Sequence, residues 1–302
     1  MLKKLFCITI LLTGCVNIQI VEDKQINIGI VTDDRFDEFI NYYKDELENK
    51  LGDTYKVDYV LSDNLMKDIE RYINLDADII VIDSSEKDHT AYINKCISKE
   101  IGCIFINNNN FENDLDVYHK ETPVLVSDHR QIGKKINEYL SQLDDKGDTN
   151  NDKILKYAFF SSNDDEYDLD ILDSFIESAN IDIEELIKQR AYYSYHNGYQ
   201  VTSDLFIKHN NEVELIISQN QEITRGVIDV VDETSVISIN GYEYIDKIDE
   251  NNISANIFVD YKKYALITLE LIDNLLAQKN EQAINMIDYY VEYKVKEKED
   301  KE

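Results

Sequence analysis

The stretch Ile26-Asn-Ile-Gly-Ile-Val31 is followed by apolar residues at helical spacing over 36–51 and by a second short run, Tyr55-Lys-Val-Asp-Tyr-Val60. A short apolar run predicts a buried strand, and apolar residues every three or four positions predict an amphipathic helix. Two strands joined by a helix are the repeating unit of a parallel sheet covered by helices. This stretch therefore predicts an α/β fold.

The same rhythm continues on both sides of two polar stretches, 107–121 and 144–152. Further strands are expected at 78–82, 103–106, 124–126, 155–160, 191–193, 215–218, 236–239, 255–259 and 287–295. Helices are expected at 64–73, 89–98, 131–143, 168–179, 198–208, 221–231 and 261–276. The restart of the rhythm, without a flexible linker, predicts two units of the same class.

We expect two doubly wound, Rossmann-like lobes with parallel sheets, joined by a hinge. Residues 24–126 with 260–283 should form the first lobe, and residues 127–259 with 284–297 the second. Ligands of open α/β sheets bind beyond the carboxyl ends of the strands. Two such lobes facing each other predict a ligand held between them and trapped by hinge closure.

The amino-terminal residues have the features of an export signal. Lys3 and Lys4 precede a short apolar stretch that ends in Leu12-Thr-Gly-Cys15. A basic start, about ten apolar residues and a small residue before the cut are typical of an export signal and are too short for a membrane span. A cysteine after the small residue matches a bacterial lipobox, so residues 1–14 would be removed and Cys15 would carry a lipid such as palmitate. An ordinary secretory signal with a chance cysteine is the alternative.

Composition narrows the function. The 302 residues include 61 acidic and 31 basic side chains, a formal net charge of −30. This charge argues against nucleic acid as a partner and against adsorption to an anionic membrane, so the lipid is the expected membrane contact. The sequence has no GxSxG motif, no phosphate-binding glycine loop and no Cys/His arrangement for catalysis or zinc, so we expect a protein that is not an enzyme.

Two further cysteines remain after export. Cys96 should lie at a helix end and Cys103 on the next strand. The sequence leaves open whether they form a disulfide.

Across 26–295 the order and spacing of the segments resemble the periplasmic sugar-binding proteins, the type I solute-binding proteins, and most of all their galactose/glucose-binding members. The resemblance implies that Asp37 accepts hydrogen bonds from sugar hydroxyls and that Phe39 stacks on the sugar ring. Without the resemblance, Asp37 is an acid in a first helical turn and Phe39 a core residue.

The resemblance implies further ligand contacts after other strands. These are Asn107, Glu166, Asp168, Tyr195, Asn220 and Asn240. The chain departs from the family at Glu166 (a histidine there), at Leu172 (an arginine) and at Val259 (an asparagine). Losing the arginine removes a bidentate donor to sugar oxygens, which puts glucose or galactose as the ligand in doubt.

One loop is a candidate calcium site. Asp148, Asn150 and Asp152 place oxygen atoms at every second residue, as calcium loops do. The resemblance implies that Glu214 completes the site. Lys153 replaces the loop glycine and Lys156 replaces a neutral ligand. A solvated acidic loop is the alternative, and no other cofactor is expected.

Together these features predict a lipid-anchored, extracytoplasmic solute-binding protein of an ABC importer, facing the cell surface or the periplasm. Its ligand would be a sugar, with monosaccharides the first class to test, and its partners the permease subunits. The alternative is a surface lipoprotein on the same scaffold whose ligand is altered or lost, acting as a sensor or interaction module.

Overall fold

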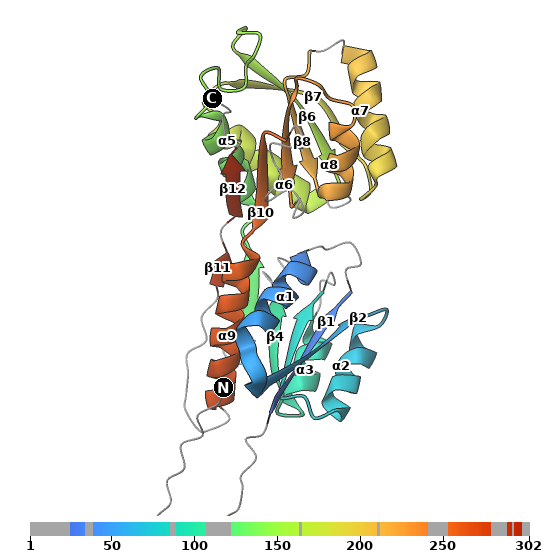
Figure 1. Cartoon of the computed structure of the whole chain (residues 1–302), viewed down its shortest axis with the longest axis vertical. Helices are drawn as coiled ribbons and strands as arrows, with labels where there is room; N and C mark the ends of the chain where they lie inside the picture. Colours follow the sequence, from blue (N-terminus) through green and yellow to red (C-terminus); the bar gives the residue numbers. More distant parts are fainter. Residues whose placement is uncertain are drawn as a thin grey trace, which may run out of the picture.

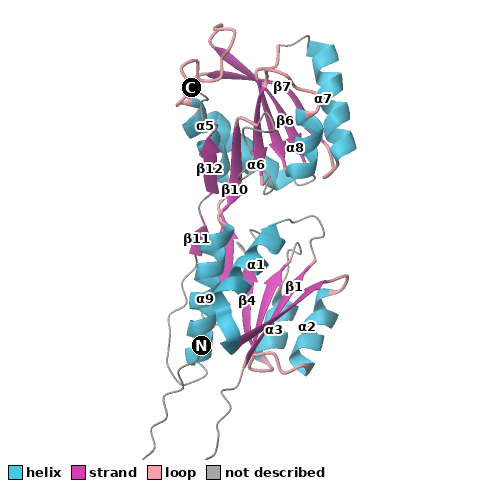
Figure 2. Ribbon diagram, in the orientation of Figure 1, coloured by secondary structure: helices cyan, strands magenta, loops and turns pink. Residues whose placement is uncertain are grey.

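The computed structural model describes residues 25–33, 39–84, 89–106, 122–162, 165–209, 212–240, 253–278, 289–291 and 293–297. They form two α/β lobes, each built on one six-stranded sheet (Figure 1; Figure 2). The predicted fold class is confirmed. No helix in these ranges combines the length and the apolar character that a membrane crossing needs.

The first sheet has the strand order β11-β5-β4-β3-β1-β2, and its strands run parallel. The elements of this lobe are β1 (Ile26–Thr32), α1 (Phe39–Leu51), the 3-10 helix η1 (Gly52–Thr54), β2 (Tyr55–Leu61), α2 (Leu65–Asn74), β3 (Ile79–Asp83), α3 (Thr90–Ile97), β4 (Gly102–Ile106), β5 (Val124–Ser127), α9 (Tyr261–Gln278) and β11 (Tyr289–Val291).

The second sheet repeats this order as β12-β10-β9-β8-β6-β7, with β12 antiparallel to β10. The elements of this lobe are α5 (Arg130–Leu140), β6 (Ile154–Ser161), α6 (Asp165–Ser178), β7 (Asp182–Arg190), α7 (Tyr195–His209), β8 (Leu215–Gln219), α8 (Gln221–Ile228), β9 (Ser235–Ile239), β10 (Ala255–Val259) and β12 (Tyr293–Glu297).

The central strands are continuous apolar runs because helices cover both of their faces. All five residues of β3 are buried. Ile79 and Val81 pack into the core shared with α1 and α9, while Ile80 and Ile82 pack into the core shared with α2 and α3. A strand buried on one face alone would alternate apolar and polar residues.

The chain crosses between the lobes three times. Asp128 and His129 link β5 to α5, Asp260 links β10 to α9, and the third crossing lies between β11 and β12. Because β5 and β10 end where the chain enters the opposite lobe, the carboxyl ends of the parallel strands in each sheet face the other lobe (Figure 1).

The third crossing corrects one predicted boundary. Residues 284–297 were expected in the second lobe, but β11 pairs with β5 in the first sheet, Tyr289 opposite Leu125. Only β12 joins the second sheet, where it pairs with β10. A single β-rich run carries no signal for the residue at which it leaves one sheet for another, so the sequence predicted one strand where there are two.

Strand β7 is a second correction. A strand was expected at 191–193, but β7 spans Asp182–Arg190, and Tyr192 and Tyr193 lie in the following turn with positive φ. Of the strands that the structure describes, it pairs only with β6, and its residues are exposed or half-buried. Charged residues are common on such edge strands because they discourage pairing with other chains, and here they hid the strand signal.

Aromatic side chains join α1 to α9 near the crossings. Tyr264 packs edge-on against Phe39, with ring centroids 4.9 Å apart. Its hydroxyl donates to the carbonyl of Leu125 on β5 over 3.3 Å. Tyr43 donates to Thr268 over 3.1 Å, and burial raises the pKa of Tyr43, so the donor stays protonated. These contacts connect α1, α9 and the strand that leads into the first crossing.

Cys96 and Cys103 form a disulfide between α3 and β4. Both residues are buried, at 1% and 2% exposure. The expected positions at a helix end and on the next strand are confirmed. Persistent disulfides are typical of proteins that work outside the reducing cytoplasm.

Replacement of Gly133 by alanine should destabilise the second lobe. A Cβ at Gly133 of α5 would overlap Ser174, the backbone nitrogen of Phe175 and the carbonyl of Ile171, all on α6. Because two of these are backbone atoms, the helices must separate, and we expect a loss of about 2–3 kcal/mol in the free energy of unfolding.

Urea unfolding of the Gly133→Ala variant checks this, with Lys134→Ala at the neighbouring exposed position as the control. The control should stay within about 0.5 kcal/mol of the parent. Equal stability of the two variants would mean that α5 and α6 do not pack this closely.

Candidate ligand-binding site

The strand order of each sheet creates one favoured place for a ligand. In both lobes the connections leave in opposite directions from two adjacent central strands, β1 and β3 in the first lobe, β6 and β8 in the second. Such a switch point leaves a crevice beyond the strand ends, where ligands of open α/β sheets bind. The candidate site therefore lies at the carboxyl ends of β6, β8 and β9 in the second lobe and of β1 and β3 in the first lobe.

Asp168 lies on α6, beneath this end of the second sheet, and is fully buried. Gln219, the last residue of β8, donates from Nε2 to Asp168 Oδ1 over 2.7 Å. The other end of the same amide, Gln219 Oε1, accepts from the backbone N–H and the hydroxyl of Ser162 at 2.7 and 2.9 Å. Burial raises the pKa of Asp168, and the hydrogen bond from Gln219 opposes that rise. Among the described residues, Asp168 Oδ2 has no hydrogen-bond partner.

Asn220 and Asn240 occupy equivalent positions directly after β8 and β9. The backbone N–H of Asn220 donates to Ile239 and that of Asn240 to Ile257, each over 2.7 Å. Both asparagines have positive φ, +52° and +56°. Asparagine tolerates this region better than most residues, and such backbone strain concentrates at functional sites. β8 and β9 are therefore each followed by a bend that places an amide side chain at the end of the sheet.

Each of these amides has one group committed and one group without a partner. Asn220 Oδ1 caps α8 by accepting from the N–H of Ile223 over 3.0 Å. Asn240 Nδ2 donates to the hydroxyl of Tyr167 over 3.3 Å. In the described part of the chain, Asn220 Nδ2 and Asn240 Oδ1 are buried without a hydrogen-bond partner.

Among the described residues, Ser161 Oγ at the end of β6 lacks a hydrogen-bond partner, and so do three side-chain atoms beyond the strands: the acceptors Asp168 Oδ2 and Asn240 Oδ1 and the donor Asn220 Nδ2. A buried polar atom without a partner costs about 1–3 kcal/mol, so such atoms are rare and need an explanation. A ligand that offers hydroxyl groups, each both donor and acceptor, satisfies both kinds. We call Asp168, Asn220 and Asn240 the polar triad.

His129, in the first crossing, adds an aromatic wall beside the polar triad. Its ring packs edge-on against Tyr167, with centroids 4.2 Å apart. Burial lowers the pKa of His129 to about 3, so the ring is neutral at physiological pH. Nothing in the local sequence pattern distinguishes His129 from the other four histidines of the chain.

Tyr195, expected to stack on a sugar, is occupied elsewhere. Its hydroxyl donates to Asp229 over 2.6 Å, and the guanidinium of Arg225 lies 5.0 Å from its ring centroid. Tyr192, which follows β7 at the carboxyl end of the sheet, is 56% exposed. Tyr192 thus offers a more exposed aromatic ring at this end of the sheet, and the neighbouring tyrosines Tyr192, Tyr193 and Tyr195 make the register ambiguous in the sequence. The stacking role of Tyr195 remains an untested prediction.

The ligand contacts expected from the first lobe are Asp37, Phe39 and Asn107, and the structure describes only Phe39 among them. Phe39 is 2% exposed and packs against Tyr43 and Tyr264, so its ring belongs to the core here. Its stacking on a sugar stays a prediction. Asp37 and Asn107 lie outside the described residues, as does the side chain of Glu166, although its backbone is part of α6.

Sequence reasoning missed a polar cluster at the switch point of the first sheet. The hydroxyl of Thr32, at the end of β1, donates to Asp83 Oδ2 over 2.8 Å. Ser84 donates to Asp33 over 3.4 Å. An acid that ends a fully apolar strand, as in Ile79-Ile-Val-Ile-Asp83, was the available signal.

The departures from the family pattern lie in the core. Leu172 is 5% exposed and Val259 3% exposed, and both pack in the main hydrophobic cluster. Neither side chain can donate or accept a hydrogen bond at the positions where the resemblance implies polar contacts.

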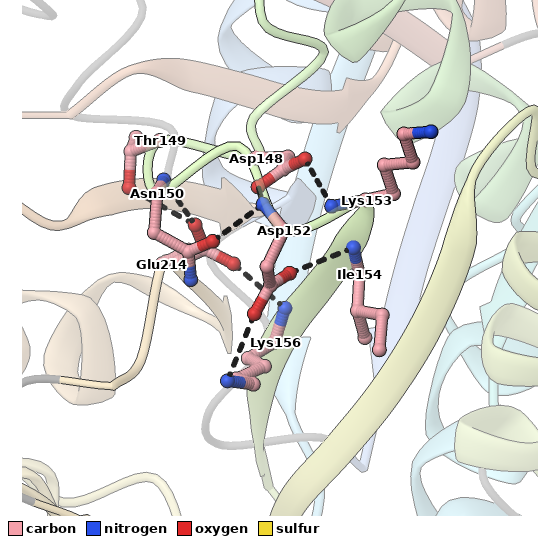
Figure 3. A network of polar contacts seen from close by, with 8 residues as sticks. All are labelled: Asp148, Thr149, Asn150, Asp152, Lys153, Ile154, Lys156 and Glu214. Atoms are coloured by element: carbon pink, nitrogen blue, oxygen red, sulfur yellow. Dashed lines mark hydrogen bonds and ion pairs between the residues drawn. The ribbon is translucent and has the colours of Figure 1, made fainter.

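The loop from Asp148 to Lys156 is fixed to Glu214 by hydrogen bonds (Figure 3). Glu214 Oε1 accepts from the hydroxyl of Thr149 and the N–H of Asn150 at 3.0 and 3.1 Å. Glu214 Oε2 accepts from the N–H of Lys156 over 3.1 Å. One buried carboxylate therefore joins the two ends of the loop.

The oxygen atoms predicted to bind calcium are committed within the loop. Asp148 accepts from the N–H groups of Asp152 and Lys153, and Asn150 accepts from that of Asp152. Asp152 accepts from the N–H of Ile154 and pairs with the ammonium of Lys156 over 3.2 Å (Figure 3).

This donor set does not fit a calcium ion, which needs six to eight free oxygen ligands. Among the described residues, no group of three or more His, Cys, Asp or Glu side chains is placed to hold a metal ion. Calcium at Asp148, Asn150, Asp152 and Glu214 therefore stays a prediction, which this arrangement disfavours. The physical reason is that Lys156 supplies the positive charge and that backbone N–H groups occupy the carboxylates.

Replacing Glu214 by glutamine should destabilise the second lobe. The amide would replace one acceptor oxygen by an NH2 donor that faces a donor of Thr149, Asn150 or Lys156, so we expect a loss of about 1.5–3 kcal/mol in the free energy of unfolding. Urea unfolding checks this, with the exposed Glu212→Gln as the matched control. Adding calcium or a chelator should leave the melting temperature of the parent unchanged. A calcium-dependent rise would restore the metal site.

No protein-family model matches the chain, and no curated protein matches it in sequence. Solved structures match it over nearly the whole length. An ABC transporter periplasmic solute-binding protein from Actinobacillus succinogenes 130z with bound D-allose is 18% identical, with 90% of this chain and 97% of that chain covered and a TM-score of 0.71. The arabinose-binding component from Shewanella sp. ANA-3, bound to L-arabinofuranose, is 14% identical over 89% and 91%, with a TM-score of 0.69. A Caulobacter myo-inositol-binding protein is 11% identical over 90% and 93%, with a TM-score of 0.68. The chain therefore has the two-lobed α/β fold of the periplasmic solute-binding proteins.

Proposed function

We propose that this chain is an extracytoplasmic solute-binding protein that captures a sugar between its two lobes. The polar triad carries the proposal. In the described part of the chain, Asp168, Asn220 and Asn240 leave two acceptors and one donor without a hydrogen-bond partner at the switch point of the second sheet. This is the place where the fold directs a ligand.

The chemistry of the triad favours a small polyhydroxylated ligand over an ion or an apolar molecule. Sugar hydroxyls need donors and acceptors in fixed directions, and the ring faces need an aromatic surface. Asn220 provides the donor, Asp168 and Asn240 the acceptors, and the exposed Tyr192 an aromatic face at the same end of the sheet. Bound allose, arabinofuranose and myo-inositol in proteins of this fold support the same class.

The ligand should differ from glucose and galactose in its contacts. Leu172 and Val259 present only hydrocarbon where the resemblance implies an arginine and an asparagine. Fewer charge-assisted hydrogen bonds predict a different or more weakly bound monosaccharide. The first-lobe contacts Asp37, Phe39 and Asn107 complete this proposal.

The predicted lipid anchor at Cys15 fits this role. A lipid on Cys15 would hold the protein at the outer face of the cytoplasmic membrane or in the periplasm, beside the permease of an ABC importer. The buried disulfide between Cys96 and Cys103 supports an oxidising location.

The rival role is that of a sensor or interaction module on the same scaffold. The loss of polar contacts at Leu172 and Val259 favours it. The two roles differ in one observable, because only the binding protein should be stabilised by a sugar.

A thermal-shift screen of the chain from residue 16 onward against monosaccharides tests the proposal. A ligand that binds the folded state stabilises it by mass action, by about 2.7 kcal/mol when its concentration is a hundredfold above the dissociation constant. The melting temperature therefore rises. Asn220→Asp should abolish the shift, since aspartate keeps the helix cap but loses the Nδ2 donor. The control is Asn64→Asp, because Asn64 caps α2 by accepting from the N–H of Lys67 over 3.0 Å. The control should keep the full shift.

Two outcomes would contradict the proposal. A flat response of the parent across the panel would favour the sensor. A sugar-induced shift that survives in Asn220→Asp would place the ligand away from the polar triad.

The anchor has its own test. In the native host, Cys15→Ser should abolish incorporation of a labelled fatty acid and release the protein from the membrane fraction, because no other lipid attachment is expected. Cys7→Ser, inside the predicted signal, is the control and should remain labelled and membrane-bound. Continued labelling of Cys15→Ser would refute the lipobox.

A further inference from the structure

Lys188 lies on the edge strand β7 and is not one of the residues of the polar triad. It lies opposite Phe159 of β6, and its Nζ is 5.9 Å from the centroid of that ring. Its side chain is only 28% exposed. A lysine on an edge strand normally extends into solvent, whereas this one lies along the face of the sheet that α6 covers.

The ammonium of Lys188 points at the buried member of the polar triad. Its Nζ lies 3.6 Å from Asp168 Oδ2, the oxygen that lacks a hydrogen-bond partner among the described residues. The other oxygen, Oδ1, accepts from Gln219. A carboxylate with 0% exposure whose other neighbours are neutral, the amide of Gln219 and the hydroxyl of Ser161, is costly unless an opposite charge compensates it. Lys188 supplies that charge from a strand that carries no predicted ligand contact.

We infer that Lys188 is a positioning residue for the ligand site: its ammonium keeps the carboxylate of Asp168 charged and holds Oδ2 in place as an acceptor. The consequence for a sugar rests on the proposed function, while the ionisation of Asp168 does not.

The other groups around Asp168 do not provide this charge. β8 contributes the neutral amide of Gln219, and β6 contributes the hydroxyl of Ser161. His129, in the crossing before α5, packs against Tyr167 and is neutral because burial lowers its pKa to about 3. Among the described residues, the positive charge that lowers the pKa of Asp168 comes from Lys188.

The direction of the effect follows from the pKa of Asp168. Burial raises it above the value in the unfolded chain, and Lys188 limits that rise. A raised carboxyl pKa means that stability is greatest below the unfolded pKa and falls as pH rises through the folded pKa. Without Lys188 the folded pKa should rise further and the loss of stability toward neutral pH should deepen.

Carbon-detected NMR titration of the mature chain tests the inference directly, with Asp168→Asn identifying the Asp168 carboxyl signal. Lys188→Met should raise the midpoint of Asp168 by about one pH unit or more. Lys188→Arg should keep it near the parent value, since the charge is retained. The control is Lys208→Met at the end of α7, an exposed position, which should leave the midpoint unchanged. A midpoint that Lys188→Met does not move would overturn the inference.

A stability cycle provides a second readout should the signal of Asp168 be obscured. Lys188→Met should lower the urea midpoint more at pH 7 than at pH 4. In the Asp168→Asn background it should cost nearly the same at both pH values. An equal pH-independent loss in both backgrounds would show a packing role only and would contradict the inference.

These measurements need no ligand, so they separate the two proposals. If sugars fail to bind but the midpoint of Asp168 depends on Lys188, the proposed function falls and the positioning role stands. If sugars bind but Lys188→Met leaves the midpoint of Asp168 unchanged, the positioning role falls and the proposed function stands. If both stand, the sugar-induced thermal shift of Lys188→Met should disappear at a higher pH than that of the parent as the solution is acidified.

Discussion

The direction of the parallel strands is the constraint on which the site depends. Strands buried on both faces must be apolar along their length, so polar chemistry is confined to their ends. The chain leaves β5 and β10 directly into the opposite lobe, which turns the carboxyl ends of each sheet toward the other lobe. Asn220 and Asn240 sit at the first positions beyond two such strands, where a backbone hydrogen bond to the next strand fixes each turn.

The second lobe meets this constraint with a connected network. Gln219 joins Ser162 on one side to Asp168 on the other, and Lys188 closes the network from the edge strand. Each member is placed by a different element, so the acceptor at Asp168 is held by the sheet as well as by its own helix. The loop fixed to Glu214 lies at the opposite end of β6 from Ser161, and it strengthens the lobe without adding to the site.

Much of the fold could be predicted because central strands are apolar runs. The strand at 255–259 matches β10 at both ends, and the helix predicted at 261–276 is two residues short of α9. β7 was missed because an edge strand with one neighbour keeps its charged residues. The change of sheet between β11 and β12 was missed because pairing partners are set by the tertiary fold and not by local pattern.

The site could be predicted where it depends on strand ends and not where it depends on side-chain direction. Asp168, Asn220 and Asn240 lie at the carboxyl end of the second sheet, as expected from their places in the sequence. The engagement of Tyr195 with Asp229 and the cation supplied by Lys156 depend on packing between helices and on loop geometry, which spacing alone does not reveal.

A crystal structure of the mature chain, grown with the sugar that gives the largest thermal shift, tests the central claim most directly. A ligand between the lobes, within hydrogen-bond distance of Asn220 Nδ2 and Asn240 Oδ1, is the predicted result. A ligand bound elsewhere, with both amide groups paired to protein atoms, would contradict it.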